Sequence, residues 1–194
     1  AYDPATVFSS IDRIGRYAYG NQPRMAHWNV TRLAEAMLPL LADEDEAAIA
    51  IAQEALGAFG PAFERHYHPG LLRKLGLTRD DTDMDLAADI LTAMTEHQVD
   101  FTLFFRHLGE AVAGAVEPVR ALFVDPTVFD AWALRWRAAL AREAQSPAAI
   151  RAVMDAVNPA FIPRNHRVEA MIDAAVERGD YAPFRELLTV LARP

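Results

Sequence analysis

The densest group of side chains able to take part in chemistry lies between residues 15 and 23, in the sequence GRYAYGNQP. It combines two glycines, two tyrosines, an arginine, an asparagine and a glutamine directly before a predicted helix. Loops of this composition present side chains and backbone donors to ligands. The segment lacks the Gly-Lys-Ser/Thr sequence of a phosphate-binding P-loop and the GxGxxG pattern of a dinucleotide site. The residue types by themselves leave both a functional and a structural role open.

Two other groups contain metal-ligand residue types but lack the spacing of a metal site. His66 and His68 are two residues apart, so on a helix their imidazoles would diverge by about 200°. We expect an exposed pair in a loop. The acidic run from Asp80 to Asp85 lacks the central glycine and the last glutamate of a calcium-binding EF-hand loop. We expect this run to be the solvated start of a helix.

Two further motifs place polar groups at predicted helix ends. In DFTLFFRHL (100–108), Asp100 is expected to cap a core helix, and Arg106 to pair with a carboxylate on a neighbouring helix. In NPAFIPRNH (158–166), two prolines fix the backbone between helices. Its polar residues are predicted to hold that turn, with a functional surface as the alternative.

The composition excludes several classes of site. The 194 residues contain no cysteine, which rules out disulfides, thiolate metal sites and a cysteine nucleophile within them. Lys74 is the one lysine. The formal net charge of −8 argues against nucleic acid as a partner. We find no GxSxG elbow and no complete catalytic set, and we predict no catalytic, cofactor-binding or metal-binding residue.

The elements that must position these residues are predicted to be helices, because apolar residues recur with helical spacing from Pro23 onward. The acidic run 43–46 should open a helix that continues to Phe63, kinks at Gly60-Pro61 and is broken at His68-Pro69-Gly70. The other predicted helices cover about 23–41, 70–75, 83–97, a stretch from 101, 126–144, 147–157, 163–178 and 183–191. We expect Ser146 to cap the helix at 147–157 and Gly179 to end the one at 163–178. In the helix at 23–41, an apolar stripe is formed by Trp28, Leu33, Met37 and Leu41. We therefore predict an all-α protein, with a loop at 1–22 and a single helical domain of eight or nine helices at 23–194.

Membrane and targeting signals are not found in the sequence. No apolar run reaches the roughly 18–20 residues of a membrane-spanning helix, and the first 22 residues lack the apolar core of a secretion signal. We expect a soluble, cytoplasmic bacterial protein with no membrane partner.

Two long segments carry a resemblance to a known family. GRYAYGNQPRMAHWNVTRLAEAMLPLL (15–41) and MDAVNPAFIPRNHRVEAMIDAAVERGDYAPFRELLTVLARP (154–194) closely resemble the selenoprotein O family, as do the shorter stretches 74–77 and 100–108. That family is similar to protein kinases in fold but transfers AMP from ATP to protein hydroxyls. The resemblance implies a C-terminal helical part of such a protein adenylyltransferase, resembling the C-terminal lobe and extension of a kinase-like fold.

The resemblance also implies where catalysis lies. In the family, the residues that hold ATP and its Mg²⁺ or Mn²⁺ precede the segment matching Ala1-Tyr2-Asp3-Pro4, so none has a matching position here. The implied partners are protein substrates and an upstream kinase-like half of the same chain, without which these residues should be inactive. The loop 1–22 then corresponds to an activation segment that faces the substrate, and the residues expected to anchor or shape it are Arg16, Tyr17, Tyr19, Asn21 and Gln22.

Two departures and one alternative accompany this interpretation. Phe8 stands where family members often carry a cysteine that can join a disulfide, and the family's cysteine- or selenocysteine-containing tail is not matched. Without an upstream half, apolar surface should be uncovered, so that the piece self-associates or has a disordered loop. The alternative function is a non-enzymatic, all-α protein-interaction domain.

Overall fold

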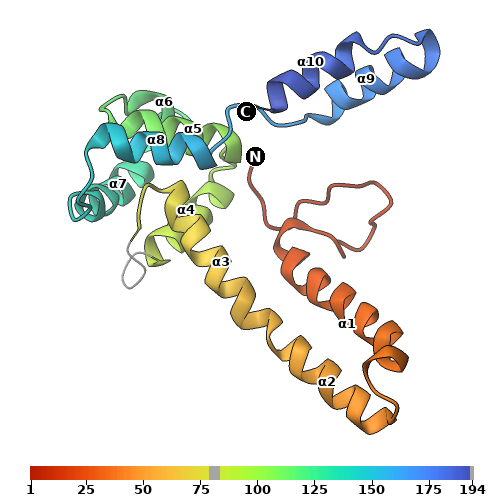
Figure 1. Ribbon diagram of the computed structural model, residues 1–194. Helices are drawn as coiled ribbons and strands as arrows, with labels where there is room; N and C mark the ends of the chain where they lie inside the picture. The colour runs from red at the N-terminus through yellow and green to blue at the C-terminus, as the bar shows by residue number, and fades with distance from the viewer. Residues whose placement is uncertain (79–83, 193–194) are drawn as a thin grey trace. The chain divides into compact units, whose positions relative to one another are not determined.

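A computed structural model describes residues 1–78 and 84–192, and every regular element in these ranges is a helix (Figure 1). The all-α prediction is therefore confirmed. Residue contacts divide the chain into two compact units, one made of Ala1–Leu72 with Thr78–Gln98 and the other of Arg73–Leu77 with Val99–Pro194. The predicted boundary at residue 22 between a loop and a helical domain stays a prediction.

The first unit begins with an irregular loop that ends in a short 3₁₀ turn, Tyr19–Asn21. Its α-helices are α1 (Gln22–Leu41), α2 (Asp45–Gly57), α3 (Phe59–Lys74, whose last residues belong to the second unit) and α4 (Met84–Glu96). Helix α1 packs along α2 (Figure 1). Alanines Ala48 and Ala52 of α2 are buried, which lets the two helices approach closely.

The break between α2 and α3 differs from the prediction. The helix ends at Gly57, and Pro61 lies in the first turn of α3, where the backbone N–H groups have no partner within the helix and a proline is tolerated. The expected break at Pro69 is wrong, because α3 continues through it to Lys74. Pro69 and Arg65 are both exposed, so solvent can satisfy the Arg65 carbonyl that Pro69 leaves without a donor.

The second unit is built around aromatic residues. Its helices are α5 (Phe101–Val112), α6 (Glu117–Arg120), α7 (Pro126–Leu140), α8 (Pro147–Val157), α9 (Asn165–Arg178) and α10 (Ala182–Leu191). Phe104 of α5 meets Trp132 of α7 with ring centroids 6.2 Å apart, and Trp132 stacks on Trp136 at 5.6 Å. Trp136 also donates a hydrogen bond from Nε1 to the Leu75 carbonyl at 2.8 Å, which ties the end of α3 to this core.

Predicted helix ends are confirmed where a cap was visible in the sequence. Asp100 accepts a hydrogen bond from the Leu103 N–H at 2.9 Å, and Ser146 accepts one from the Ala149 N–H at 3.3 Å. Gly179 ends α9 in the left-handed conformation, with φ +62°. Gly76 follows α3 with φ +77°, and a Cβ there would lie 2.7 Å from a side-chain carbon of Ile150.

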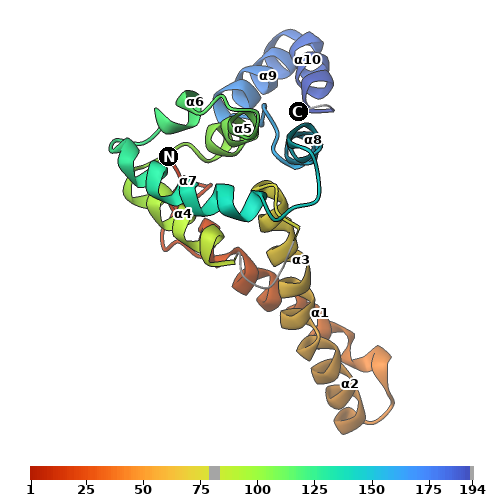
Figure 2. The ribbon, with the colours of Figure 1, turned by 90° about the vertical axis from the view of Figure 1, so that its left-hand side faces the viewer.

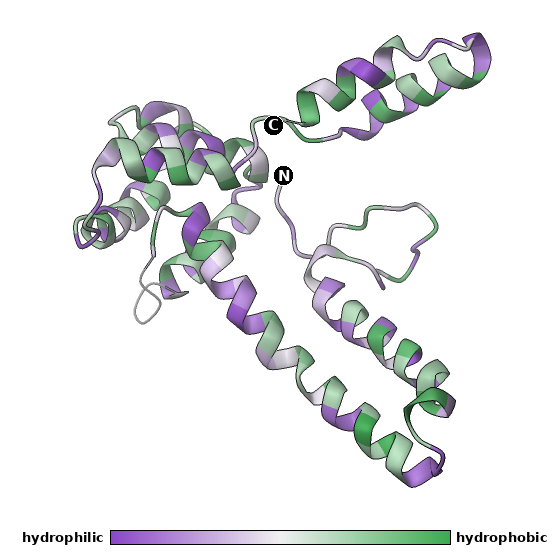
Figure 3. Ribbon diagram, viewed as in Figure 1, coloured by the Kyte–Doolittle hydropathy of each residue, from purple (hydrophilic) through white to green (hydrophobic). Residues whose placement is uncertain are grey.

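Some hydrophobic residues of the first unit are buried and others are exposed to solvent. They recur along α1 and α2 (Figure 3), yet Leu33 and Met37, which belong to the apolar stripe of α1, are exposed. The α1–α2 groove is lined by apolar residues of both helices, including Val30, Ile51 and Leu56. None of the helices in the described ranges is long and apolar enough to span a membrane.

Candidate functional site: the loop before α1

The loop that precedes α1 is organised around the carboxylate of Asp12. Its Oδ1 accepts a hydrogen bond from the backbone N–H of Arg16 at 2.8 Å, and its Oδ2 accepts one from that of Tyr17 at 2.7 Å. Between them the chain turns at Gly15, whose φ of +70° lies in the left-handed region that glycine adopts without strain. One acidic side chain therefore fixes the direction of the chain as it approaches α1.

Asn21 and Gln22 fix the same turn from its other end. The Asn21 side chain donates from Nδ2 to the Gly15 carbonyl at 2.8 Å, and the Gln22 side chain donates from Nε2 to the Tyr17 carbonyl at 2.6 Å. The Ala18 N–H also donates to the Gly15 carbonyl, at 3.1 Å. Both amides predicted from the sequence thus anchor the loop by bonding its backbone.

Arg16 is held against α1 by an aromatic ring. The centre of its guanidinium lies 4.2 Å from the ring centroid of Trp28 and 5.5 Å from that of Tyr17. Its Nε is buried and finds no acceptor among the described residues. A guanidinium at this distance over an indole face makes a cation–π interaction, so Arg16 links the loop to the first turns of α1.

Tyr19 joins the two ends of the loop. Its N–H donates to the Thr6 carbonyl at 3.0 Å, and its ring meets that of buried Tyr2 edge-on at 5.5 Å. Burial, with smaller effects from neighbouring tyrosines and Asp3, raises the pKa of Tyr2 to about 12. Burial also raises the pKa of Tyr19, and the nearby Tyr67 raises it by a smaller amount. The two phenols therefore stay neutral over the ordinary pH range and serve to pack the loop.

The outer side of the loop is apolar and open. Phe8, Ile11 and Ile14 are exposed by 62%, 88% and 89%, and the Tyr17 ring lies nearby at 44% exposure. A shallow pocket of about 390 Å³ is lined by Ser9, Ile11, Asp12, Arg13, Ile14, Arg16 and Tyr17. This arrangement can bind an extended protein segment, since it joins apolar contact area to hydroxyl and guanidinium groups.

The five residues expected to shape the loop therefore lie together, but with different tasks. Arg16, Tyr19, Asn21 and Gln22 hold the loop in place, and Tyr17 reaches its outer side. Asp12 was not among the expected residues, although its two hydrogen bonds set the turn. One feature of the sequence indicates this role: Asp12 lies three residues before Gly15 in a predicted loop, and aspartate side chains in turns accept hydrogen bonds from nearby backbone N–H groups.

The NPAFIPRNH motif forms a structural joint in the second unit. Asn158 is 1% exposed and donates from Nδ2 to the Lys74 carbonyl at 2.9 Å. Its own carbonyl accepts a hydrogen bond from Arg106 at 3.2 Å, and Arg106 pairs with Asp155 at 3.4 Å. Arg164 lies 3.8 Å from the Asp100 carboxylate. These contacts agree with the predicted role in holding the turn.

Lys74 belongs to the same joint. Its Nζ donates to the Val157 carbonyl at 3.3 Å and lies 4.7 Å from the ring centroid of Phe105. Burial lowers its pKa. The only lysine of the sequence therefore faces aromatic rings and a backbone carbonyl, and this setting does not fit a role in holding nucleotide phosphates.

The remaining metal-like groups do not assemble into a site. His66 and His68 lie within α3, so the expectation of a loop is wrong because that helix continues through Pro69. Most of the acidic run from Asp80 lies outside the described residues. Within the described ranges, no group of three or more His, Asp or Glu side chains is close enough to hold a metal ion.

Comparison with known proteins agrees with the resemblance drawn from the sequence. The profile of the family described as "Protein adenylyltransferase SelO" matches residues 1–192. The chain belongs to the SelO family. It is 62% identical over its whole length to the "Protein nucleotidyltransferase YdiU" of a strain of Methylorubrum extorquens. Proteins of the same name from a strain of Rhodopseudomonas palustris and from Bradyrhizobium diazoefficiens are 58% and 57% identical to it.

These SelO relatives are considerably longer than the chain. The chain covers 41% of the Methylorubrum extorquens protein and 40% of the other two. The Asp12 turn and the NPAFIPRNH joint both lie within the matched residues 1–192.

Proposed function

We propose that these residues form the helical C-terminal part of a protein adenylyltransferase that transfers AMP from ATP to Ser, Thr or Tyr hydroxyls of proteins. The observation that carries the proposal is the match of the SelO family across residues 1–192. The relatives' printed name, protein nucleotidyltransferase, is consistent with it. Because the chain covers 41% of such a relative, the activity is proposed for the full-length polypeptide.

The nucleotide and its Mg²⁺ or Mn²⁺ would be held by residues outside this chain. When bound, the metal and ATP supply an activated phosphoryl centre for attack by a hydroxyl. Lys74 contacts the Val157 carbonyl and the Phe105 ring, and no group of three or more His, Asp or Glu side chains among the described residues is placed to hold a metal ion. We therefore derive no step of AMP transfer from this chain and expect it to be inactive by itself.

The loop before α1 would shape the side from which the protein substrate approaches. Its backbone is fixed by Asp12, Asn21 and Gln22, and its apolar outer side carries Ile11 and Tyr17. A loop with a fixed backbone positions a bound segment at a lower entropic cost than a flexible one. This role rests on the resemblance of the loop to an activation segment.

The test is the chemical product. The full-length polypeptide is co-expressed with bacterial cytoplasmic proteins, and mass spectrometry searches them for AMP adducts on hydroxyl residues. Adducts that depend on the polypeptide support the proposal. If no adduct forms while the 194 residues still bind other proteins through their helices, the alternative of a non-enzymatic interaction domain is favoured.

A further inference from the structure

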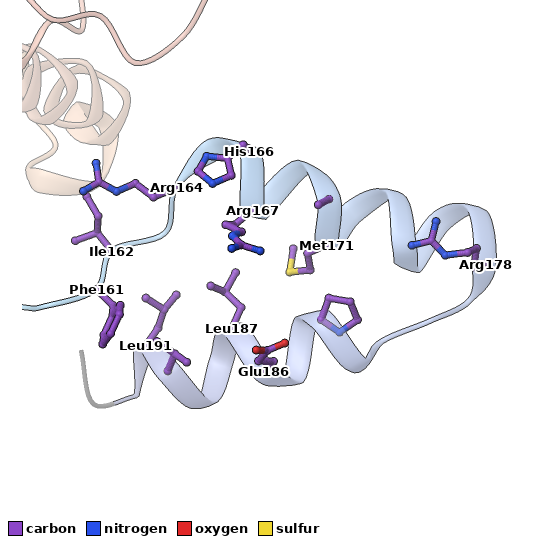
Figure 4. Close-up of a pocket in the computed structure, with 13 residues that line it drawn as sticks. Phe161, Ile162, Arg164, His166, Arg167, Met171, Arg178, Glu186, Leu187 and Leu191 are labelled. Carbon is purple, nitrogen blue, oxygen red and sulfur yellow. The ribbon is translucent and has the colours of Figure 1, made fainter.

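Helices α9 and α10 form a hairpin that encloses a groove. The two helices lie side by side in both views (Figure 1 and Figure 2), and each packs mainly on the other. Ala174 is buried where they meet. Between the helices and the preceding segment lies a groove of about 640 Å³, which Figure 4 shows with its lining side chains.

The groove is apolar inside and basic at its edges. Met171 of α9 and Leu187 of α10 point into it from opposite sides, with Arg167 beside them (Figure 4). Its lining includes Arg164, His166, Arg167 and Arg178 and one acidic residue, Glu186. Arg164 pairs with Asp100 at 3.8 Å and Arg178 with Glu177 at 3.9 Å. Arg167 makes no ion pair within the described residues. This arginine beside apolar side chains makes the groove complementary to an apolar segment that carries an acidic group.

The hairpin has further exposed apolar residues outside the groove. Ile172 and Val176 of α9, and Phe184 and Leu188 of α10, are spaced four residues apart on their helices and do not line the groove. Val176 is 78% exposed and Leu188 is 59% exposed. Helices of 14 and 10 residues are also marginal in water without packing.

We infer that the α9–α10 groove is covered permanently by an apolar, acidic segment from the part of the full-length polypeptide that lies outside these 194 residues. The full-length polypeptide has room for such a segment, because the chain covers 41% of the Methylorubrum extorquens relative. A transient partner would leave a short hairpin exposed on both sides for much of the time, whereas a segment of the same chain is always present at high effective concentration. The inference shares with the proposed function the premise that the chain is part of a longer polypeptide.

Photo-crosslinking in the full-length polypeptide tests this inference. Benzoylphenylalanine replaces Leu187 at the groove, and in a control it replaces Leu134, which is 70% exposed on α7. The inference expects crosslinks from position 187 to peptides outside residues 1–194 of the same molecule, and none of these from position 134. Crosslinks to a second copy, to another protein, or only to peptides within residues 1–194 would overturn it.

Hydrogen exchange provides a second readout that does not depend on activity. In the full-length polypeptide, the amides of α9 and α10 should be as protected as those of α5, and Arg167→Glu should lower their protection about tenfold or more. Arg137→Glu, an exposed arginine on α7, is the matched control and should leave them unchanged. Rapid exchange of α9 and α10 in the unmodified polypeptide would contradict the inference.

The inference and the proposed function can fail separately. Measured AMP transfer with an uncovered groove would refute the inference alone, and a covered groove without AMP transfer would refute the proposed function alone.

Discussion

Asn21 donates a hydrogen bond from its side-chain nitrogen to the carbonyl oxygen of Gly15 at 2.8 Å, across six residues of the loop before α1. Gly15 is the residue at which the loop turns, with φ +70°. The bond therefore joins the start of α1 to the turn that sets the course of the preceding chain. Asn21 is thus one of three side chains, with Asp12 and Gln22, that fix the shape of the loop side that we propose faces the protein substrate.

Replacing Asn21 with alanine tests this control. Asn21→Ala in the full-length polypeptide removes a part-buried hydrogen bond, so stability should fall by about 1 kcal/mol, the amides of Arg16 and Tyr17 should exchange faster, and AMP transfer should decrease. Asn29→Ala, an exposed asparagine on α1, is the matched control and should change none of these. Unchanged activity and unchanged exchange in Asn21→Ala would remove this residue from the site.

The glycine after α3 permits a comparison of two similar substitutions. Gly76→Ala forces an alanine into a left-handed backbone and places its Cβ 2.7 Å from Ile150 and 2.8 Å from Met154, so it should destabilise the protein by about 3 kcal/mol. Gly179→Ala imposes a similar φ of +62° but meets nothing within 4 Å, so it should cost about 1 kcal/mol. Thermal unfolding of both variants checks the difference. Equal losses would mean that α8 does not pack closely on the end of α3.

The pKa of Tyr2 predicts a loss of stability at alkaline pH. Burial raises it from 10.0 to about 12, so the folded loop keeps a proton that the unfolded chain releases. This contribution is complete below pH 10 and is lost as pH rises towards about 12. Lys74 has the opposite effect on the pH dependence of stability. Burial lowers its pKa from 10.5, so the folded state binds fewer protons than the unfolded chain as Lys74 titrates, and this contribution to stability increases with pH.

Ultraviolet titration of tyrosinate measures this effect. Tyr2→Phe should remove a late-ionising phenol and flatten the loss of stability between pH 10 and 12. Tyr181→Phe, at a residue 55% exposed, is the matched control and should leave the late transition in place. A Tyr2 that ionises at pH 10 would show that the loop is not packed as the structure has it.

The parts of the fold that sequence predicted best are those set by local chemistry. The side chains of Asp100 and Ser146 cap the starts of α5 and α8, and the left-handed backbone of Gly179 ends α9. The break predicted at Pro69 is wrong because a proline inside a helix is costly but tolerated on an exposed side, and exposure depends on tertiary packing.

The site was predictable in its place but not in its contacts. The sequence pointed to Arg16, Asn21 and Gln22 through their density near two glycines, whereas the partners of these side chains depend on how the loop folds back. Trp28 shows the difference, since its helical spacing places it on an apolar stripe, whereas the structure shows its ring against the Arg16 guanidinium at 42% exposure. Periodicity cannot separate an apolar residue that is buried from one that supports a cation.

The most direct measurement is AMP transfer by the full-length polypeptide and by residues 1–194 separately, each incubated with ATP labelled in its AMP moiety, Mg²⁺ or Mn²⁺, and a protein mixture. The full-length polypeptide should attach labelled AMP to protein hydroxyls, and residues 1–194 should neither transfer AMP nor bind ATP. Labelling or ATP binding by residues 1–194, or no transfer by the full-length polypeptide, would contradict the proposed function.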